Sequence, residues 1–232
     1  DVGADHVVRM TLRGISRSRS ADDVSPKEPI LQADLERMVR TLDDDESSKC
    51  IYLRALLLFA WMGAMRRSEI TALRWKHLRW TEQGVAVLVV RSKGDQTGQG
   101  QEIPIPFASN TTLCPVRALQ RLRQRLQKLG GENDGHRPVF PLLTKAGGVR
   151  WMRASAERTL LDRIRETATT AGLDPDAFGM HSFRSGFATE ASRRGRDIER
   201  IQKHLRHKST ATTARYVRRG RLFEDSAAVG IL

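Results

Sequence analysis

The chain has little of what defines several common protein classes. Its 232 residues include two cysteines, Cys50 and Cys114, which lie far apart and in no CxxC spacing. The sequence allows one disulfide between them, but free thiols in a reducing, cytoplasmic setting are the simpler interpretation. The most apolar stretch, residues 55–64, is too short to span a bilayer and has an arginine near each end. It therefore predicts a buried helix rather than a membrane anchor.

The usual ligand-binding motifs are also missing. The sequence contains no HExxH, no paired cysteines, no P-loop and no GxGxxG. His181, His204 and His207 could cluster in the fold, but no acidic partner accompanies them as a metal site would require. We therefore expect neither a metal nor a nucleotide cofactor.

Acidic residues are too few to balance the basic ones. Lysine and arginine number 40 against 27 aspartates and glutamates, which gives a net charge of +13. Residues 181–222 alone carry twelve basic and three acidic residues, or +9 of that excess. Such a concentration favours a polyanionic partner, with nucleic acid first and an anionic membrane second. No long amphipathic anchor supports the membrane alternative.

Hydrophobic spacing predicts a mostly α protein with a small antiparallel β-sheet, an α+β class. The Ser-rich residues 14–29 are typical of a linker. Strands are expected at 85–90 and 102–106, joined by a glycine-rich turn. Helices are expected at 31–42, 49–64, 68–73 with Ser68 as its cap, 115–129 and 151–171, and as several short ones between 182 and 231.

Tyrosine is scarce, and one of the two tyrosines has unusual neighbours. Tyr52 lies in the apolar helix and fits a packing role, whereas Tyr216 lies among arginines and histidines. A half-buried ring is the ordinary explanation for Tyr216. The alternative is a nucleophile that attacks a phosphodiester, which also needs cations at the non-bridging oxygens and an acid for the leaving oxygen.

Candidates for those partner roles occur elsewhere in the chain, and each one alone has an ordinary explanation. Arg66 follows the apolar helix, and Glu69 is three residues further on, close enough to hold it. Lys93 lies on the glycine-rich turn, where a solvated lysine is common. His181 and Arg184 are three residues apart and would share one face of a helix.

Taken together, these segments resemble the tyrosine recombinase (phage integrase) family over residues 28–232. The resemblance rests on Gly-Ala-Met-Arg-Arg-Ser-Glu-Ile at 63–70, His-Ser-Phe-Arg at 181–184, Arg-His-Lys-Ser at 206–209 and Thr-Thr-Ala-Arg-Tyr at 212–216. The first segment departs from the commoner Gly-Leu-Arg, and the distance to Glu69 favours Arg66 over Arg67. Several matching positions in one order are far more specific than any single one.

The resemblance implies a site-specific recombinase that cuts and rejoins double-stranded DNA through a 3′-phosphotyrosyl link, without metal or ATP. It also implies the residue roles. Tyr216 is the nucleophile, Arg66 and Arg184 hold the phosphate oxygens, His207 donates to the phosphate, Lys93 is the general acid, His181 assists proton movement, and Glu69 orients Arg66.

The resemblance further implies a domain layout and an assembly. Residues 1–13 look like the end of an N-terminal core-binding domain, 14–29 like a linker, 30–221 like the catalytic domain and 222–232 like an exchanged tail. A free monomer is expected to form a tetramer on DNA, without a membrane partner. The rivals are a type IB topoisomerase, which shares much of this chemistry, and a non-catalytic DNA-binding protein on the same fold.

Overall fold

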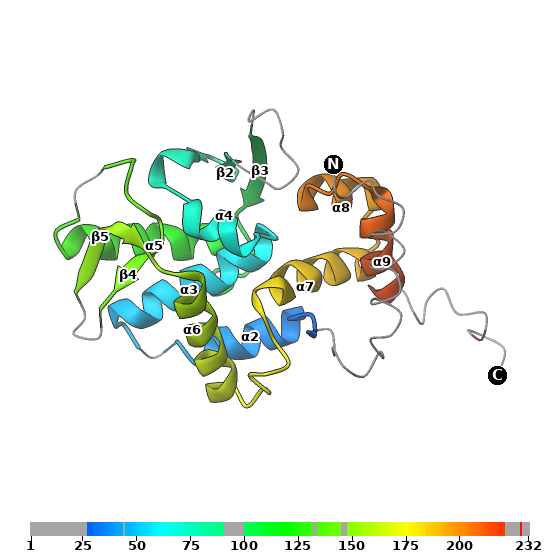
Figure 1. Cartoon of the computed structure of the whole chain (residues 1–232), viewed down its shortest axis with the longest axis horizontal. Coiled ribbons are helices and arrows are strands. Elements are labelled where there is room, and N and C mark those ends of the chain that lie inside the picture. Colours follow the sequence, from blue (N-terminus) through cyan, green and yellow to red (C-terminus); the bar gives the residue numbers. More distant parts are fainter. Residues whose placement is uncertain are drawn as a thin grey trace, which may run out of the picture.

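The computed structural model describes residues 27–43, 45–90, 100–131, 134–144, 148–220 and 228. Lys93, residues 1–13, nearly all of the expected linker, and the expected tail apart from Ala228 lie outside the described residues. Along the described chain the elements are mostly helices, with two small antiparallel sheets (Figure 1). The expected class is confirmed. Within these ranges, no helix combines the length and apolar character needed to cross a membrane.

Helix α3 (Ser48–Met62) forms the centre of the hydrophobic core. Ten of its residues are buried, because its sequence is apolar on all sides. The hydroxyl of Ser47 caps its start by accepting from the Cys50 amide at 3.2 Å. Helices α2 (Gln32–Arg40), α5 (Pro115–Lys128), α6 (Glu157–Thr170) and α7 (Met180–Arg193) pack around it. The expected buried helix is thus confirmed, and both cysteines are free thiols.

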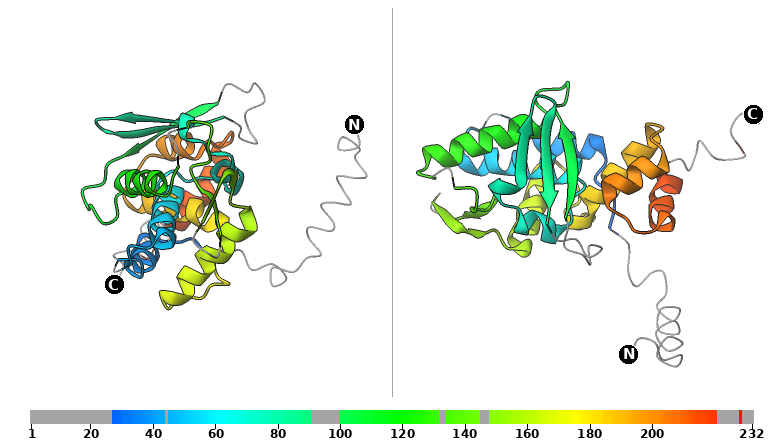
Figure 2. Two further views of the ribbon diagram at one scale, coloured as in Figure 1. Left: turned by 90° about the vertical axis from the view of Figure 1, so that its left-hand side faces the viewer. Right: turned by 90° about the horizontal axis from the view of Figure 1, so that it is seen from above.

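A three-stranded antiparallel sheet covers part of this core. Strands β1 (Leu78–Thr81), β2 (Gly84–Val89) and β3 (Gln101–Pro106) pair in chain order, after the short 3-10 helix η2 (Trp75–His77). Alternate residues of β2 and β3 point into the core, as period-two patterning predicts. Figure 2 shows the three strands side by side in the view from above. The expected sheet is confirmed.

A second sheet corrects one prediction. Strands β4 (Pro141–Leu143) and β5 (Val149–Ala154) pair antiparallel, so the helix expected from residue 151 begins only at Glu157. Residues 149–153 mix Val and Trp, which favour strands, with arginines, and pairing with β4 decides their conformation. Ser155 anchors the junction, since its hydroxyl accepts from Tyr52 at 2.9 Å.

The C-terminal helices form a smaller unit at one end of the molecule. Helices α8 (Ile198–Leu205) and α9 (Thr210–Gly220) pack on α7, next to the end of α3 (Figure 1). Gly195, with φ of 69°, separates α7 from α8. Ala64 belongs to the same small apolar cluster as Ile201 and Leu205, so this packing brings the turn after α3 against the α8–α9 region.

Helix α4 (Arg67–Ala72) corrects another detail. Ser68 was expected to cap this helix, but the capping residue is Arg66. The Glu69 carboxylate accepts from the Arg66 amide at 2.8 Å, the half of a capping box in which the third helical residue reaches back to the N-cap amide. The start of α4 is therefore tied directly to the predicted Arg66–Glu69 pair.

Candidate active site

The turn between α3 and α4 presents a backbone carbonyl to two arginines. Ala64 has a φ of 43°, a left-handed conformation that costs a non-glycine residue roughly 1 kcal/mol or more. Its carbonyl accepts from Arg184 Nη1 at 2.8 Å and from Arg206 Nη2 at 3.1 Å. These charge-assisted bonds offset the strain and fix the turn immediately before Arg66.

Arg66 and Glu69 are brought together as their spacing predicts. Arg66 Nη1 donates to Glu69 Oε1 at 2.7 Å, and Arg66 Nη2 donates to the carbonyl of Arg206 at 3.3 Å. The Arg66 side chain keeps 23% of its surface exposed, whereas that of Glu69 keeps 1%. Arg66 can therefore meet a ligand from solvent while the carboxylate behind it stays buried.

Sequence reasoning missed the role of Arg206, which was noted only as part of a matching segment. Its guanidinium, 1% exposed, donates to Glu69 Oε2 at 2.8 Å, so the carboxylate is shared between Arg66 and Arg206. Arg206 ends α8 with φ of 55° and ψ of 43°. An arginine where a helix end usually has glycine was the one available signal.

Arg184 is buried beneath the same turn. Its side chain is among the largest fully buried ones, and its Nη1 and Nη2 donate to the carbonyls of Ala64 and Leu205. Burial, followed by the charges of Arg66 and Arg206, lowers the pKa of Arg184 from 12.5 to about 9. The guanidinium stays charged at neutral pH and adds positive potential to the site.

Tyr216 lies between two histidines. Its hydroxyl is 2.7 Å from His181 Nε2, and its ring stacks on His207 with centroids 5.9 Å apart and planes 19° apart. α7 supplies His181 at its start and α9 supplies Tyr216, so the contact between these helices creates the pair. The packing explanation suits Tyr52, whose ring is fully buried, better than it suits Tyr216.

Both histidines are biased toward the neutral form. Burial, followed by the charges of Arg184 and Arg66, lowers the pKa of His181. The same causes, together with His181 and Arg206, lower the pKa of His207 from 6.5 to about 4. His207 Nδ1 lies 2.9 Å from the hydroxyl of Thr213, a buried residue that the sequence did not single out. A neutral imidazole can accept a proton at one nitrogen and donate at the other.

The structure thus brings together Arg66, Glu69, His181, Arg184, His207 and Tyr216, which lie 150 positions apart at the extremes of the sequence. Lys93 falls in the segment between β2 and β3 that is not described, and its role stays a prediction. Among the described residues, no group of three or more histidine, cysteine, aspartate or glutamate side chains is placed to hold a metal ion. The site is a cluster of cations and neutral histidines around one phenol, which suits a phosphate ligand.

Comparison with known proteins identifies the family of the chain. Residues 29–221 match the phage integrase family. A XerD-type integrase/recombinase homologue of Selenomonas ruminantium is 34% identical over 223 residues, covering 96% of this chain and 63% of the relative. A tyrosine recombinase XerC of Xanthomonas axonopodis pv. citri is 29% identical, covering 87% and 59% respectively.

Solved structures share the fold. A XerH site-specific recombinase bound to palindromic difH substrate, in a post-cleavage complex, aligns with a TM-score of 0.65 at 20% identity, covering 88% of this chain and 53% of that one. A Tn1549 transposon integrase in complex with a circular intermediate DNA aligns with a TM-score of 0.60 at 17% identity, covering 84% and 62%.

The fold and the site define a mostly helical protein in which one tyrosine lies among arginines and histidines. The chain belongs to the phage integrase family, since the match extends over most of its length. It spans about 60% of the length of the curated relatives named above.

Proposed function

We propose that this chain is the catalytic part of a site-specific recombinase, in which Tyr216 attacks a DNA phosphodiester. The observation that carries the proposal is the 2.7 Å contact between the Tyr216 hydroxyl and His181 Nε2, at the edge of the arginine cluster. A phenol needs a base to become a nucleophile, and a neutral histidine at this distance can serve. Relatives named tyrosine recombinases support the same reaction class.

The proposed step uses only groups of the protein and the DNA, and every bond and proton in it is accounted for. The Tyr216 oxygen bonds to phosphorus as its proton passes to His181, and the 5′-oxygen leaves with a proton from Lys93. The product is a 3′-phosphotyrosyl link and a free 5′-hydroxyl. The phosphodiester bond energy is retained in that link, so the reverse attack rejoins DNA without ATP or a metal.

The cations would stabilise charge that develops on the two non-bridging oxygens. Arg66 would reach them from its partly exposed position. Arg184 uses one hydrogen of each Nη group on a backbone carbonyl, and each group carries a second hydrogen for phosphate. Thr213 would donate to His207 Nδ1, which leaves the proton on Nε2 free to donate to the phosphate.

Double-stranded DNA is the proposed substrate, and backbone contacts are expected to supply much of the affinity. Residues 181–222, which include the proposed nucleophile, carry a net charge of +9. Such contacts release counterions, so binding should weaken steeply as salt rises. Base-specific contacts would come from a smaller set of side chains.

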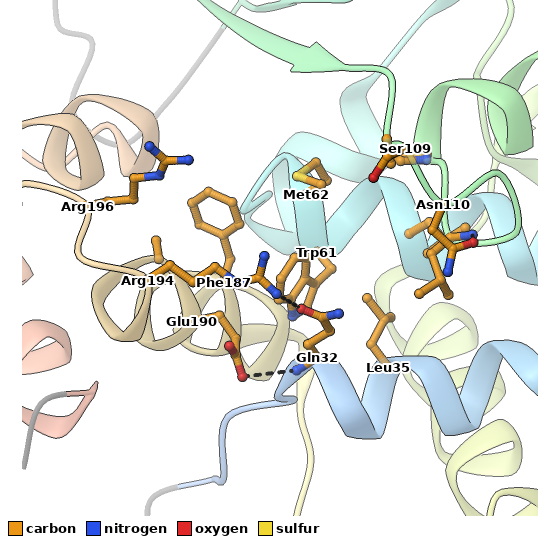
Figure 3. Close-up of a pocket in the computed structure, with 15 residues that line it drawn as sticks. Gln32, Leu35, Trp61, Met62, Ser109, Asn110, Phe187, Glu190, Arg194 and Arg196 are labelled. Atoms are coloured by element: carbon orange, nitrogen blue, oxygen red, sulfur yellow. Dashed lines mark hydrogen bonds between the residues drawn. The ribbon is translucent and has the colours of Figure 1, made fainter. Parts of the chain in front are cut away.

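The active oligomer is proposed to be a tetramer on DNA, formed by exchange of the 222–232 tail between protomers. The tail sequence carries five large apolar residues, Leu222, Phe223, Val229, Ile231 and Leu232. We assign its receiving site to a mostly apolar pocket of about 340 Å³ between α2, α3 and α7, which Leu35, Trp61 and Phe187 help to line (Figure 3). A second copy's tail would bury its apolar side chains there.

Two variants test this assembly. Deleting residues 222–232 and replacing Ser109 at the pocket rim by tryptophan should each reduce synaptic complexes on DNA. Because both changes break one contact, the double variant should assemble no worse than the deletion alone. Unchanged assembly after the deletion would contradict the exchange, and independent effects of the two changes would contradict the assignment to this pocket.

The reaction is tested with a nicked suicide substrate, which traps the covalent intermediate. Wild type and Tyr52→Phe should form a protein–DNA adduct, and Tyr216→Phe should form none. Absence of an adduct with wild type would favour the non-catalytic DNA-binding alternative. Relaxation of supercoiled DNA without strand exchange would favour the type IB topoisomerase alternative.

A further inference from the structure

Arg206 occupies a backbone position that suits glycine. It ends α8 in the left-handed region, and its side chain turns inward to 1% exposure instead of reaching solvent. Helices commonly end with glycine in this conformation, since a side chain there is strained. A buried charge adds a desolvation cost unless it is well paired. The arginine therefore needs a compensating role.

Its guanidinium joins two parts of the site that are far apart in sequence. Nη2 donates to Glu69 Oε2 at 2.8 Å and to the Ala64 carbonyl at 3.1 Å. Nη1 donates to the His204 carbonyl at 2.6 Å, within α8. The side chain thus ties the turn that precedes Arg66 to the end of the helix that precedes His207.

Residue 206 holds Arg66 directly through its backbone carbonyl and indirectly through Glu69. Arg66 Nη2 donates to the Arg206 backbone carbonyl at 3.3 Å, and Arg66 Nη1 donates to Glu69, which the Arg206 side chain holds in turn. The position of the partly exposed Arg66 side chain therefore depends on the conformation and the side chain of residue 206.

Charge gives a second reason for the arginine. Arg66, Arg206 and Glu69 together carry +1, because one carboxylate is shared by two guanidinium groups. Without Arg206 the carboxylate would face Arg66 alone, and the pair would be neutral. A neutral pair would attract a phosphate less strongly at the point where negative charge develops.

We propose that Arg206 is a positioning residue for strand cutting: it orients Arg66 and His207 and offsets the Glu69 charge so that Arg66 remains available to the phosphate. This rests on the proposed function, since the reaction supplies the phosphate. The rival explanation is that Arg206 only fills space between α8 and the turn after α3.

Arg206→Gly separates the two explanations, because glycine suits the backbone conformation at this position and removes the side chain alone. Cleavage of the suicide substrate is measured in a single turnover at saturating DNA. We expect the rate to fall about 10- to 100-fold, as for a catalytic group displaced by about 1 Å. Arg40→Ala removes an exposed, ion-paired charge from α2, outside residues 181–222, and should cleave at the wild-type rate.

A second variant tests the charge argument. Adding Glu69→Gln to Arg206→Gly restores the net charge of the remaining group to +1, and the glutamine can still accept from Arg66. The double variant should therefore cleave faster than Arg206→Gly. A double variant no faster than Arg206→Gly would contradict charge balance as part of the role.

Nuclear magnetic resonance supplies a readout that needs no reaction. In wild type the Arg66 Nε–H signal, assigned with Arg66→Lys, should be sharp and slow to exchange, and in Arg206→Gly it should broaden. An unchanged Arg66 signal with wild-type cleavage would overturn the proposal. If wild type forms no adduct, the proposed function fails, and the Arg66 signal still decides whether Arg206 positions it.

Discussion

Acidification is expected to destabilise the fold through His204. Its ring stacks on Phe187, with centroids 4.4 Å apart, and its Nε2 lies 2.8 Å from the Met62 carbonyl, so Nε2 carries a proton. Burial lowers the pKa of His204 from 6.5 to about 4; the bond to Met62 opposes this shift, and the charges of Arg206 and Arg184 add to it.

The direction of the pH effect on stability follows from whether the folded or the unfolded state binds the proton more tightly. The unfolded chain protonates near pH 6.5, whereas the native ring stays neutral until about pH 4. The contribution of His204 to the free energy of unfolding is therefore complete above pH 6.5 and is lost progressively as the pH falls to about 4. Proton linkage gives a loss of about 2 kcal/mol between pH 7 and pH 5.

The matched variant is His204→Gln, which keeps a donor for the Met62 carbonyl and does not titrate. Urea unfolding at pH 7 and pH 5 should show that the variant loses about 2 kcal/mol less stability than wild type over this interval. His207 is present in both proteins, so its contribution to the loss of stability cancels when the two losses are compared. Equal losses, or a His204 titration midpoint near 6.5 in the native protein, would refute the reasoning.

Three further outcomes are expected. Tyr52→Phe removes the hydrogen bond to Ser155 and should cost about 1 kcal/mol of unfolding free energy while adduct formation is retained. Gly186→Ala should cost about 3 kcal/mol or more in thermal unfolding, since a Cβ there would lie 1.8 Å from the Ile30 carbonyl oxygen; a wild-type melting temperature would contradict this. DNA affinity should fall steeply between 50 and 200 mM salt in a binding titration, and a flat dependence would contradict backbone contacts as the main source of affinity.

Features that depend on local spacing could be predicted from the sequence. The central helix follows from its unbroken apolar run, and the Arg66–Glu69 contact follows from a separation of three residues at a helix start. Strand β2 follows from a run of mostly β-branched apolar residues and strand β3 from alternating apolar residues, on either side of a glycine-rich turn. In each case the pattern that decides the conformation lies within a few positions of the residues concerned.

Features that depend on distant partners could not be predicted. Strand β5 is a strand because β4 pairs with it, and residues 149–154 alone do not decide between helix and strand. The partner of Arg206 is Glu69, 137 positions earlier, so spacing gave no sign of the buried pair. Lys93 lies outside the described residues, and its role as general acid stays a prediction.

The central claim is that Tyr216 is the nucleophile, and the most direct test is to identify the residue that bears the DNA. Wild-type protein is trapped on a nicked suicide substrate, digested with protease and nuclease, and analysed by mass spectrometry. The account predicts one modified peptide, with the nucleotide 3′-phosphate on Tyr216. Attachment to another residue, or no attachment at all while DNA is bound, would contradict it.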